Sequence, residues 1–190
     1  MSAPPGDGKT HVEDRDRGCA LPGPGESLRL ERQLCFALYS AANLTTRLYR
    51  PLLEPLGITY PQYLALLALW DRAPRSVGEL GNALGLDSGT LTPLLKRLEA
   101  GGLVTRTRDA RDERRVLVGL TPAGVALRER AAAVPETLRC AISLAPDEAE
   151  ALRDALWRYV RTLRTGTPDP ADSILPADPR DPAAVDADPP

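Results

Sequence analysis

Cys35 is the residue in this 190-residue chain whose type and setting could do redox chemistry. The thiolate form of a cysteine attacks the O–O bond of a peroxide, and the resulting sulfenic acid condenses with a second thiol to a disulfide. Cys35 is flanked by Leu34 and Phe36, however, and a cysteine among apolar residues is more often a buried structural residue. On residue types alone, a peroxide-reactive thiol and a structural core thiol both stay open.

Three tyrosines are candidates for supporting a charged sulfur at Cys35. Apolar neighbours disfavour a thiolate, whereas hydroxyl groups that donate hydrogen bonds to the sulfur oppose that effect. Tyr39, Tyr49 and Tyr60 follow Cys35 in the chain and carry such hydroxyls. An apolar rim would also favour a lipophilic hydroperoxide over hydrogen peroxide. The same tyrosines are compatible with ordinary core aromatics whose hydroxyls are satisfied.

A second group of residues has the pattern of a DNA-binding helix-turn-helix. Two short helices are predicted over 77–84 and 88–100, because Ser76 with Glu79 forms a capping-box pattern and Asp87 is a good N-cap. In this motif the second helix enters the major groove with its N-terminus first, where small residues let backbone amides approach phosphates. Residues further along that helix can reach the DNA backbone or base edges. The candidate DNA-binding residues on the second helix are Ser88, Gly89, Thr90, Thr92, Lys96 and Arg97.

Two strand-like runs, 103–107 and 116–120, follow the second helix and flank a charged tip. Such a hairpin can place arginines in the narrow minor groove. The alternative is a structural scaffold whose arginines form a solvated charged face, but the order of the pieces favours DNA binding. The arginines at or near the tip are Arg108, Arg111, Arg114 and Arg115.

The spacing of apolar residues predicts helices on both sides of this element. Pro51 is expected to break the first of them. The predicted fold class is therefore mainly α with a small β-hairpin wing, a winged helix-turn-helix within a helical frame. The expected helices outside the DNA-binding element cover 28–49, 62–71, a segment from residue 122 and 146–164.

Charge and composition divide the chain into a folded unit over 27–164, with the DNA-binding lobe at about 76–120, and two tails. Residues 1–26 are rich in Gly, Pro and charge, and residues 165–190 alternate Pro, Asp and Ala, so both are expected to be disordered. The tails carry net charges of −2 and −5, so the unit between them carries +5 within a whole-chain charge of −2. A basic folded unit indicates an anionic partner such as nucleic acid.

Composition also excludes several classes of protein. No apolar run reaches the roughly 18 residues that a membrane span needs, and no signal-peptide pattern opens the chain, so we expect a cytoplasmic protein without membrane contact. The odd count of three cysteines does not suit a secreted disulfide framework. His11 is the single histidine of the chain, so we expect no metal site and no cofactor.

The winged segment resembles the MarR family of bacterial transcriptional regulators. The resemblance lies in Leu86-Asp87-Ser88-Gly89-Thr90-Leu91-Thr92-Pro93-Leu94-Leu95-Lys96-Arg97-Leu98 and in the wing Asp109-Ala110-Arg111-Asp112-Glu113-Arg114. The segments around Cys35 and Tyr49, together with Tyr60-Pro61-Gln62-Tyr63, look like the OhrR branch, which senses organic hydroperoxides. The resemblance covers about 27–164.

The resemblance implies roles for the thiols and tyrosines. Cys35 matches the peroxide-reactive cysteine, and Cys140 matches the second, resolving cysteine of a two-cysteine subgroup. Tyr49 and Tyr60 match tyrosines that hydrogen-bond the thiolate from the partner subunit, and Tyr39 matches a further pocket tyrosine. Cys19 has no counterpart, and an exposed thiol there could compete as the resolving partner.

The resemblance also implies an assembly. A homodimer is expected, with 27–57 and 121–164 as dimerisation helices, bound to a pseudo-palindromic double-stranded DNA operator. Arg114 takes the minor-groove role in each wing, with Asp112 as the residue that orients it.

We therefore expect a redox-sensing repressor, not an enzyme, that releases its operator when an organic hydroperoxide oxidises Cys35 and an intersubunit disulfide forms with Cys140. One alternative is a regulator whose dimer pocket binds a small aromatic ligand, the thiol being incidental. A thiol peroxidase is less favoured, because no histidine near Cys35 can act as a general acid or base.

Overall fold

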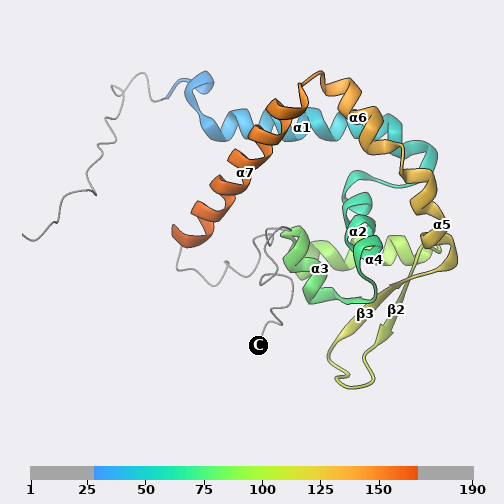
Figure 1. Cartoon of the computed structure of the whole chain (residues 1–190). Coiled ribbons are helices and arrows are strands. Elements are labelled where there is room, and N and C mark those ends of the chain that lie inside the picture. The colour runs from blue at the N-terminus through green and yellow to red at the C-terminus, as the bar shows by residue number, and fades with distance from the viewer. Residues whose placement is uncertain (1–27, 167–190) are drawn as a thin grey trace, which may run out of the picture. The chain divides into compact units, whose positions relative to one another are not determined.

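A computed structural model describes residues 28–166, which form helices and one small sheet (Figure 1). The expected tails lie outside the described residues, apart from residues 165 and 166, and so does Cys19. The described residues fall into two compact units, 28–44 and 45–166. The elements are the 3-10 turns η1 (Leu30–Arg32) and η2 (Glu54–Leu56), the helices α1 (Leu34–Leu53), α2 (Tyr60–Asp71), α3 (Val77–Leu84), α4 (Ser88–Ala100), α5 (Pro122–Ala131), α6 (Val134–Ile142) and α7 (Pro146–Gly166), and the strands β1 (Arg75–Ser76), β2 (Val104–Arg108) and β3 (Val116–Leu120).

The first long helix differs from its prediction at both ends. It begins at Leu34 rather than Leu28, and it continues past Pro51 to Leu53. The prediction that Pro51 breaks the helix is wrong, because a proline in the last turn removes one backbone hydrogen bond and leaves the preceding turns intact. The chain then makes the short turn η2 and reverses at Gly57, whose φ of 72° is readily adopted by glycine.

The helix-turn-helix has the predicted boundaries at both of its helices. At the start of α3 the Ser76 hydroxyl accepts from the Glu79 backbone N–H at 3.2 Å, and the Glu79 carboxylate accepts from the Ser76 N–H at 2.6 Å. This reciprocal pair is the expected capping box. Helix α4 packs its apolar face into the core through Leu91, Leu95 and Leu98, each at most 1% exposed. The opposite face of α4 is thereby left for a partner.

The sheet has three antiparallel strands in the order β1-β3-β2. The β2–β3 hairpin is the predicted wing, shifted by one residue in β2. Strand β1 was not predicted, because two residues are too few to show an alternating pattern. It pairs Arg75 with Val118 and Ser76 with Leu117, so the chain that enters α3 is bonded directly to the wing.

Helix α5 closes the lobe against α2 and the start of the wing. The Trp70 Nε1–H donates to the Gly124 carbonyl at 2.9 Å, and the Thr121 hydroxyl caps α5 by accepting from the Gly124 N–H at 3.0 Å. Gly124 is buried against the backbone carbonyl of Leu103. Beyond α5 the chain forms α6 and α7, and α7 begins at Pro146 as predicted. Among residues 28–166, no helix is both long and apolar enough to cross a membrane.

We predict that Gly124→Ala destabilises the lobe by about 1–3 kcal/mol, because the added methyl group overlaps with the Leu103 carbonyl and overpacking has costs of that order. Urea unfolding followed by circular dichroism measures the free energy of unfolding. Gly101→Ala is the matched control, since its methyl group would meet the Arg97 carbonyl oxygen at 3.4 Å. Equal stability of the two variants would contradict the close packing of α5.

Candidate functional site

The N-terminus of α4 presents the predicted group of small residues to solvent. Asp87 caps the helix: one carboxylate oxygen accepts from the Thr90 N–H at 2.9 Å and the other from the Thr90 hydroxyl at 2.8 Å. These hydrogen bonds, first of all the one from the Thr90 hydroxyl, lower the pKa of Asp87, so the cap is a carboxylate at neutral pH. A methyl group at Gly89 would lie 2.9 Å from the Asp87 carboxylate, so a larger residue there would require the capping side chain to shift.

The structure brings the α4 candidates together on one exposed region. Ser88, Gly89 and Thr90 are exposed at the start of the helix, and Thr92 is half-buried one turn on. Lys96 and Arg97 are exposed further along. The Thr90 hydroxyl already donates to Asp87, so the backbone amides and the cationic side chains are the groups best suited to meet DNA phosphates.

The wing tip is a short turn held by two aspartates. Asp109 accepts from the backbone N–H of Arg111 at 2.9 Å, and Asp112 accepts from the backbone N–H of Arg114 at 3.0 Å. The Arg114 guanidinium also contacts both Asp112 carboxylate oxygens, at 3.1 and 3.2 Å, although its side chain is 91% exposed. The hydrogen bonds from Arg114 hold the pKa of Asp112 below its ordinary value. Arg114 is thus oriented by Asp112 while its guanidinium remains accessible.

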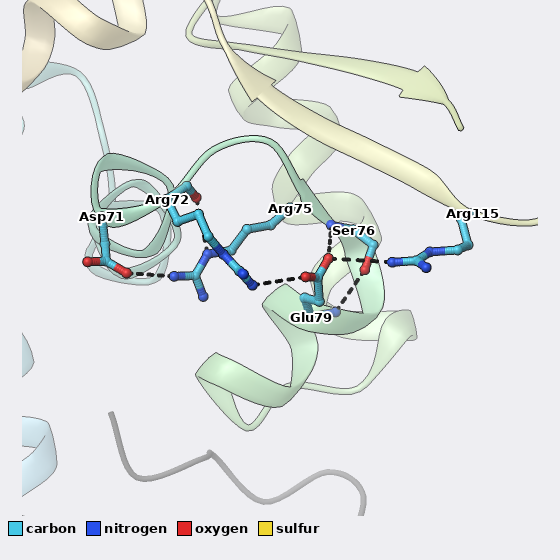
Figure 2. Close-up of polar contacts among 6 residues, drawn as sticks. All are labelled: Asp71, Arg72, Arg75, Ser76, Glu79 and Arg115. Atoms are coloured by element: carbon cyan, nitrogen blue, oxygen red, sulfur yellow. Dashed lines mark hydrogen bonds and ion pairs between the residues drawn. The ribbon is translucent and has the colours of Figure 1, made fainter. Parts of the chain in front are cut away.

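Arg115 does not belong to this tip. Its guanidinium lies 3.8 Å from the Glu79 carboxylate of α3, on the inner side of the wing (Figure 2). We expected Arg115 to reach the minor groove with the other arginines of the tip, but the structure places it against Glu79. Arg114 lies in the turn of the wing tip, whereas Arg115 follows that turn directly before β3, where its side chain reaches Glu79.

Glu79 is at the centre of a polar cluster that the sequence shows only as a capping box. One oxygen of the Glu79 carboxylate accepts from the Arg72 guanidinium at 3.0 Å, and the other accepts from the Ser76 backbone N–H (Figure 2). Burial raises the pKa of the Glu79 carboxyl, but hydrogen bonds from Ser76 and the charges of Arg72 and Arg115 outweigh burial and bring the pKa below its ordinary value. Glu79 is therefore an anion between two guanidinium groups.

Cys35 is exposed, near the start of α1. Within the unit formed by 28–44, its apolar neighbours Leu34 and Phe36 are 58% and 39% exposed, and Tyr39, one helical turn on, is 66% exposed. The interpretation of Cys35 as a buried core thiol is therefore wrong for the described chain. The exposed apolar side chains beside Cys35 are available to a partner.

The other unit brings Tyr49 and Tyr60 together. Their ring centroids are 4.4 Å apart, and Tyr63 lies beside Tyr49 at 5.8 Å. Burial, with smaller contributions from Tyr60 and Tyr63, raises the pKa of Tyr49 to about 12, and burial raises the pKa of Tyr60 as well. Both hydroxyls are therefore protonated at neutral pH and can donate hydrogen bonds.

A cavity of about 560 Å³ opens beside this tyrosine pair, between the end of α1 and the start of α2. Leu53 and Ile58 give it an apolar wall, Tyr60 lies at one side, and Arg47 and Arg50 bring two cationic side chains to it. Its volume suits a small organic molecule.

Cys140 is exposed in the last turn of α6. The preceding residue, Arg139, pairs with Glu136 on the same helix face. The structure places Cys35 and Cys140 in different units, so it does not test whether the two thiols meet.

Comparison with known proteins gives a family and several similar structures. The sequence profile of the MarR family matches residues 58–116. The organic hydroperoxide resistance transcriptional regulator of Bacillus subtilis (strain 168) is 46% identical over 138 residues, which cover 73% of this chain and 94% of that protein.

Among solved structures, reduced AbfR bound to DNA aligns with a TM-score of 0.61 and 39% identity, covering 73% of this chain and 97% of that one. Disulfide-formed AbfR aligns with a TM-score of 0.52 and 38% identity, covering 73% and 94%. A further similar structure is that of AbfR of Staphylococcus epidermidis. The winged helix-turn-helix is thus shared with proteins solved on DNA.

We predict that Tyr49→Phe reduces the loss of stability in alkali. The folded state holds the Tyr49 proton more tightly than the unfolded chain, so its stabilising effect is present below about pH 10 and is lost as the pH rises toward 12. Phenylalanine cannot ionise, so the fall in the urea midpoint between about pH 9 and about pH 11 should be smaller in the variant. Tyr39→Phe, at an exposed position, is the control, and the same fall in both variants would contradict the burial of the Tyr49 hydroxyl.

Proposed function

Because the chain belongs to the MarR family of DNA-binding transcriptional regulators, we propose that it is a repressor controlled by oxidation of Cys35. The observation that carries the proposal is the pair of half-buried, protonated tyrosines, Tyr49 and Tyr60, beside a cavity in a chain with an exposed thiol. The similarity to an organic hydroperoxide resistance regulator supports organic hydroperoxides as the oxidant class.

DNA binding uses the two exposed surfaces of the lobe. The N-terminus of α4 enters the major groove, where its backbone amides and Lys96 and Arg97 meet phosphates and base edges. The wing reaches the adjacent minor groove with Arg114, which Asp112 holds in place, and Arg111 adds charge beside it. In a homodimer on a pseudo-palindromic operator, each half-site takes one lobe.

The apolar residues exposed on the N- and C-terminal helices support dimerisation. On α7, Leu152, Leu156 and Leu163 are 39–51% exposed, and Ile142 on α6 is 39% exposed. Together with the exposed surface around Cys35, they would leave large apolar side chains in water in a monomer. A second copy of the chain covers them and brings the Cys35 of one subunit to the tyrosines of the other.

The sensing reaction begins at the Cys35 thiolate, supported by hydrogen bonds from the Tyr49 and Tyr60 hydroxyls. The sulfur attacks the terminal oxygen of the hydroperoxide: an S–O bond forms, the O–O bond breaks, and the alkoxide takes up a proton and leaves as an alcohol. Cys35 is oxidised to a sulfenic acid and the peroxide is reduced. The apolar wall of the cavity favours an organic substituent over hydrogen peroxide.

The sulfenic acid then condenses with Cys140 of the partner subunit. The Cys140 sulfur attacks the Cys35 sulfur, an S–S bond forms and the S–O bond breaks, and the leaving hydroxide takes the proton of the Cys140 thiol to become water. A disulfide form of the similar AbfR is known, which supports this step. Disulfide geometry holds the two Cα atoms within roughly 4.4–6.8 Å, so the bridge fixes α1 of one subunit against α6 of the other. The two DNA-binding lobes then change their spacing, and operator affinity falls.

We predict that an organic hydroperoxide such as cumene hydroperoxide releases the wild-type protein from its operator but not Cys35→Ser, because serine cannot form a sulfenic acid. Fluorescence anisotropy of labelled operator DNA measures release, with reductant restoring binding of the wild type. Both proteins should bind equally before oxidation. Equal release in both would refute Cys35 as the sensor, and release of Cys35→Ser by a small aromatic compound without oxidant would favour the cavity as a ligand site.

We predict that oxidised wild-type protein runs as a dimer on a non-reducing gel and that Cys140→Ser abolishes this band. Without a resolving thiol, the sulfenic acid of Cys35 should persist and be trapped by dimedone, visible as a mass increase. Cys19→Ser is the matched control and should still give the dimer band. A band that survives in Cys140→Ser but is lost in Cys19→Ser would assign resolution to Cys19.

A further inference from the structure

Glu79 makes more contacts than a capping residue needs. Its carboxylate accepts from the Ser76 N–H within the capping box, and it also contacts the guanidinium groups of Arg72 at 3.0 Å and Arg115 at 3.8 Å (Figure 2). Arg72 follows the end of α2, and Arg115 directly precedes β3 of the wing. The side chain of Glu79 is 22% exposed, so the charge is partly shielded from water and salt. One carboxylate thus joins the helix-turn-helix to its neighbouring helix and to the wing.

We propose that Glu79 is a positioning residue for DNA binding: it fixes the base of the wing to α3, and so sets where Arg114 at the tip meets the DNA. The connection is short along the chain, because Arg115, which contacts Glu79, is the immediate neighbour of Arg114. The proposal rests on the minor-groove role proposed for Arg114 and is independent of the redox chemistry of Cys35.

A second connection holds the other strand of the wing. Arg106 of β2 lies 3.4 Å from the carboxylate of Glu99 on α4. Arginine–glutamate pairs therefore join β2 to α4 and the residue directly before β3 to α3. Loss of the Glu79 contact leaves the hairpin attached through Arg106 and through the pairing of β1 with β3, so the lobe should stay folded while the segment that carries Arg114 and Arg115 changes its position.

The direction in which DNA affinity changes when Glu79 is neutralised distinguishes a positioning role from a simple electrostatic one. DNA is a polyanion, so removing a carboxylate from a DNA-binding lobe should strengthen binding or leave it unchanged. If Glu79 positions the wing, its neutralisation should weaken binding instead. Glutamine at this position still accepts the Ser76 N–H, since both Glu and Gln serve in the capping box. Glu79→Gln therefore removes the charge while keeping the helix cap.

The experiment measures operator affinity of the reduced, full-length protein by fluorescence anisotropy for Glu79→Gln, Arg114→Ala and the double variant. Glu79→Gln is expected to weaken binding about tenfold, equivalent to ~1.4 kcal/mol. In the Arg114→Ala background, where the tip contact is already absent, Glu79→Gln should have no further effect. Such non-additivity is the sign of two residues acting through one contact.

Two controls accompany the comparison of the single and double variants. Glu113→Gln removes an exposed carboxylate from the wing tip and should leave affinity unchanged or raise it. Thermal unfolding of each variant verifies that the lobe is folded. Hydroxyl-radical footprinting should show that Glu79→Gln loses protection in the minor groove at the outer ends of the operator while the contacts of α4 are kept.

The outcomes distinguish the two claims. If Arg114→Ala weakens binding but Glu79→Gln binds as tightly as wild type, or loses as much affinity in the Arg114→Ala background as alone, the positioning role is overturned and the wing assignment stands. If Arg114→Ala itself leaves affinity unchanged, the proposed minor-groove contact is wrong, and the inference about Glu79 fails with it.

Discussion

The DNA-binding lobe depends on the backbone pairing of β3 with strands on both of its sides. On one side β3 pairs with β2 to make the wing, and on the other it pairs with β1, the two residues that lead directly into α3. Hydrogen bonds across an antiparallel ladder tie the strand positions together. Because β1 ends at the N-cap of α3, the wing and the helix-turn-helix share one framework. The Glu79 cluster extends this connection beyond the ladder, because Arg115 lies outside β3 on the side of the wing tip.

The charges of the lobe are divided between internal contacts and contacts available to DNA. Arg75 is 6% exposed and donates to the Asp71 carboxylate at 2.7 Å, while Arg72 and Arg115 contact Glu79. These cations stabilise the fold, and a count of basic residues overstates the charge offered to phosphates. Lys96, Arg97 and Arg111 lie on the exposed surface, and Arg114 is held at the tip by Asp112.

Sequence patterns predicted those elements whose ends carry their own chemical signals. The limits of α3 and α4 were confirmed because Ser76 and Asp87 are caps and glycines end or follow the helices. The wing was confirmed for the same local reason, whereas β1 could not be found, because its pairing is with residues about forty positions away. Pro51 does not break α1 because it lies in the last turn of the helix, and composition does not indicate that position.

The candidate site was predictable only in part. The adjacency of Tyr49 and Tyr60 was expected from the family resemblance, and the structure shows the rings in contact. Glu79 was recognised as a cap but not as a partner of Arg72 and Arg115, since those contacts join residues from three elements. Helix α2 relates these two regions. Tyr60, its first residue, lines the cavity, and Asp71, its last residue, accepts a hydrogen bond from Arg75. The two ends of the helix are about 17 Å apart at 1.5 Å per residue. Its middle is embedded in the core through Tyr63, Leu66 and Leu69, so one packed helix joins the cavity to the short strand that leads into the helix-turn-helix.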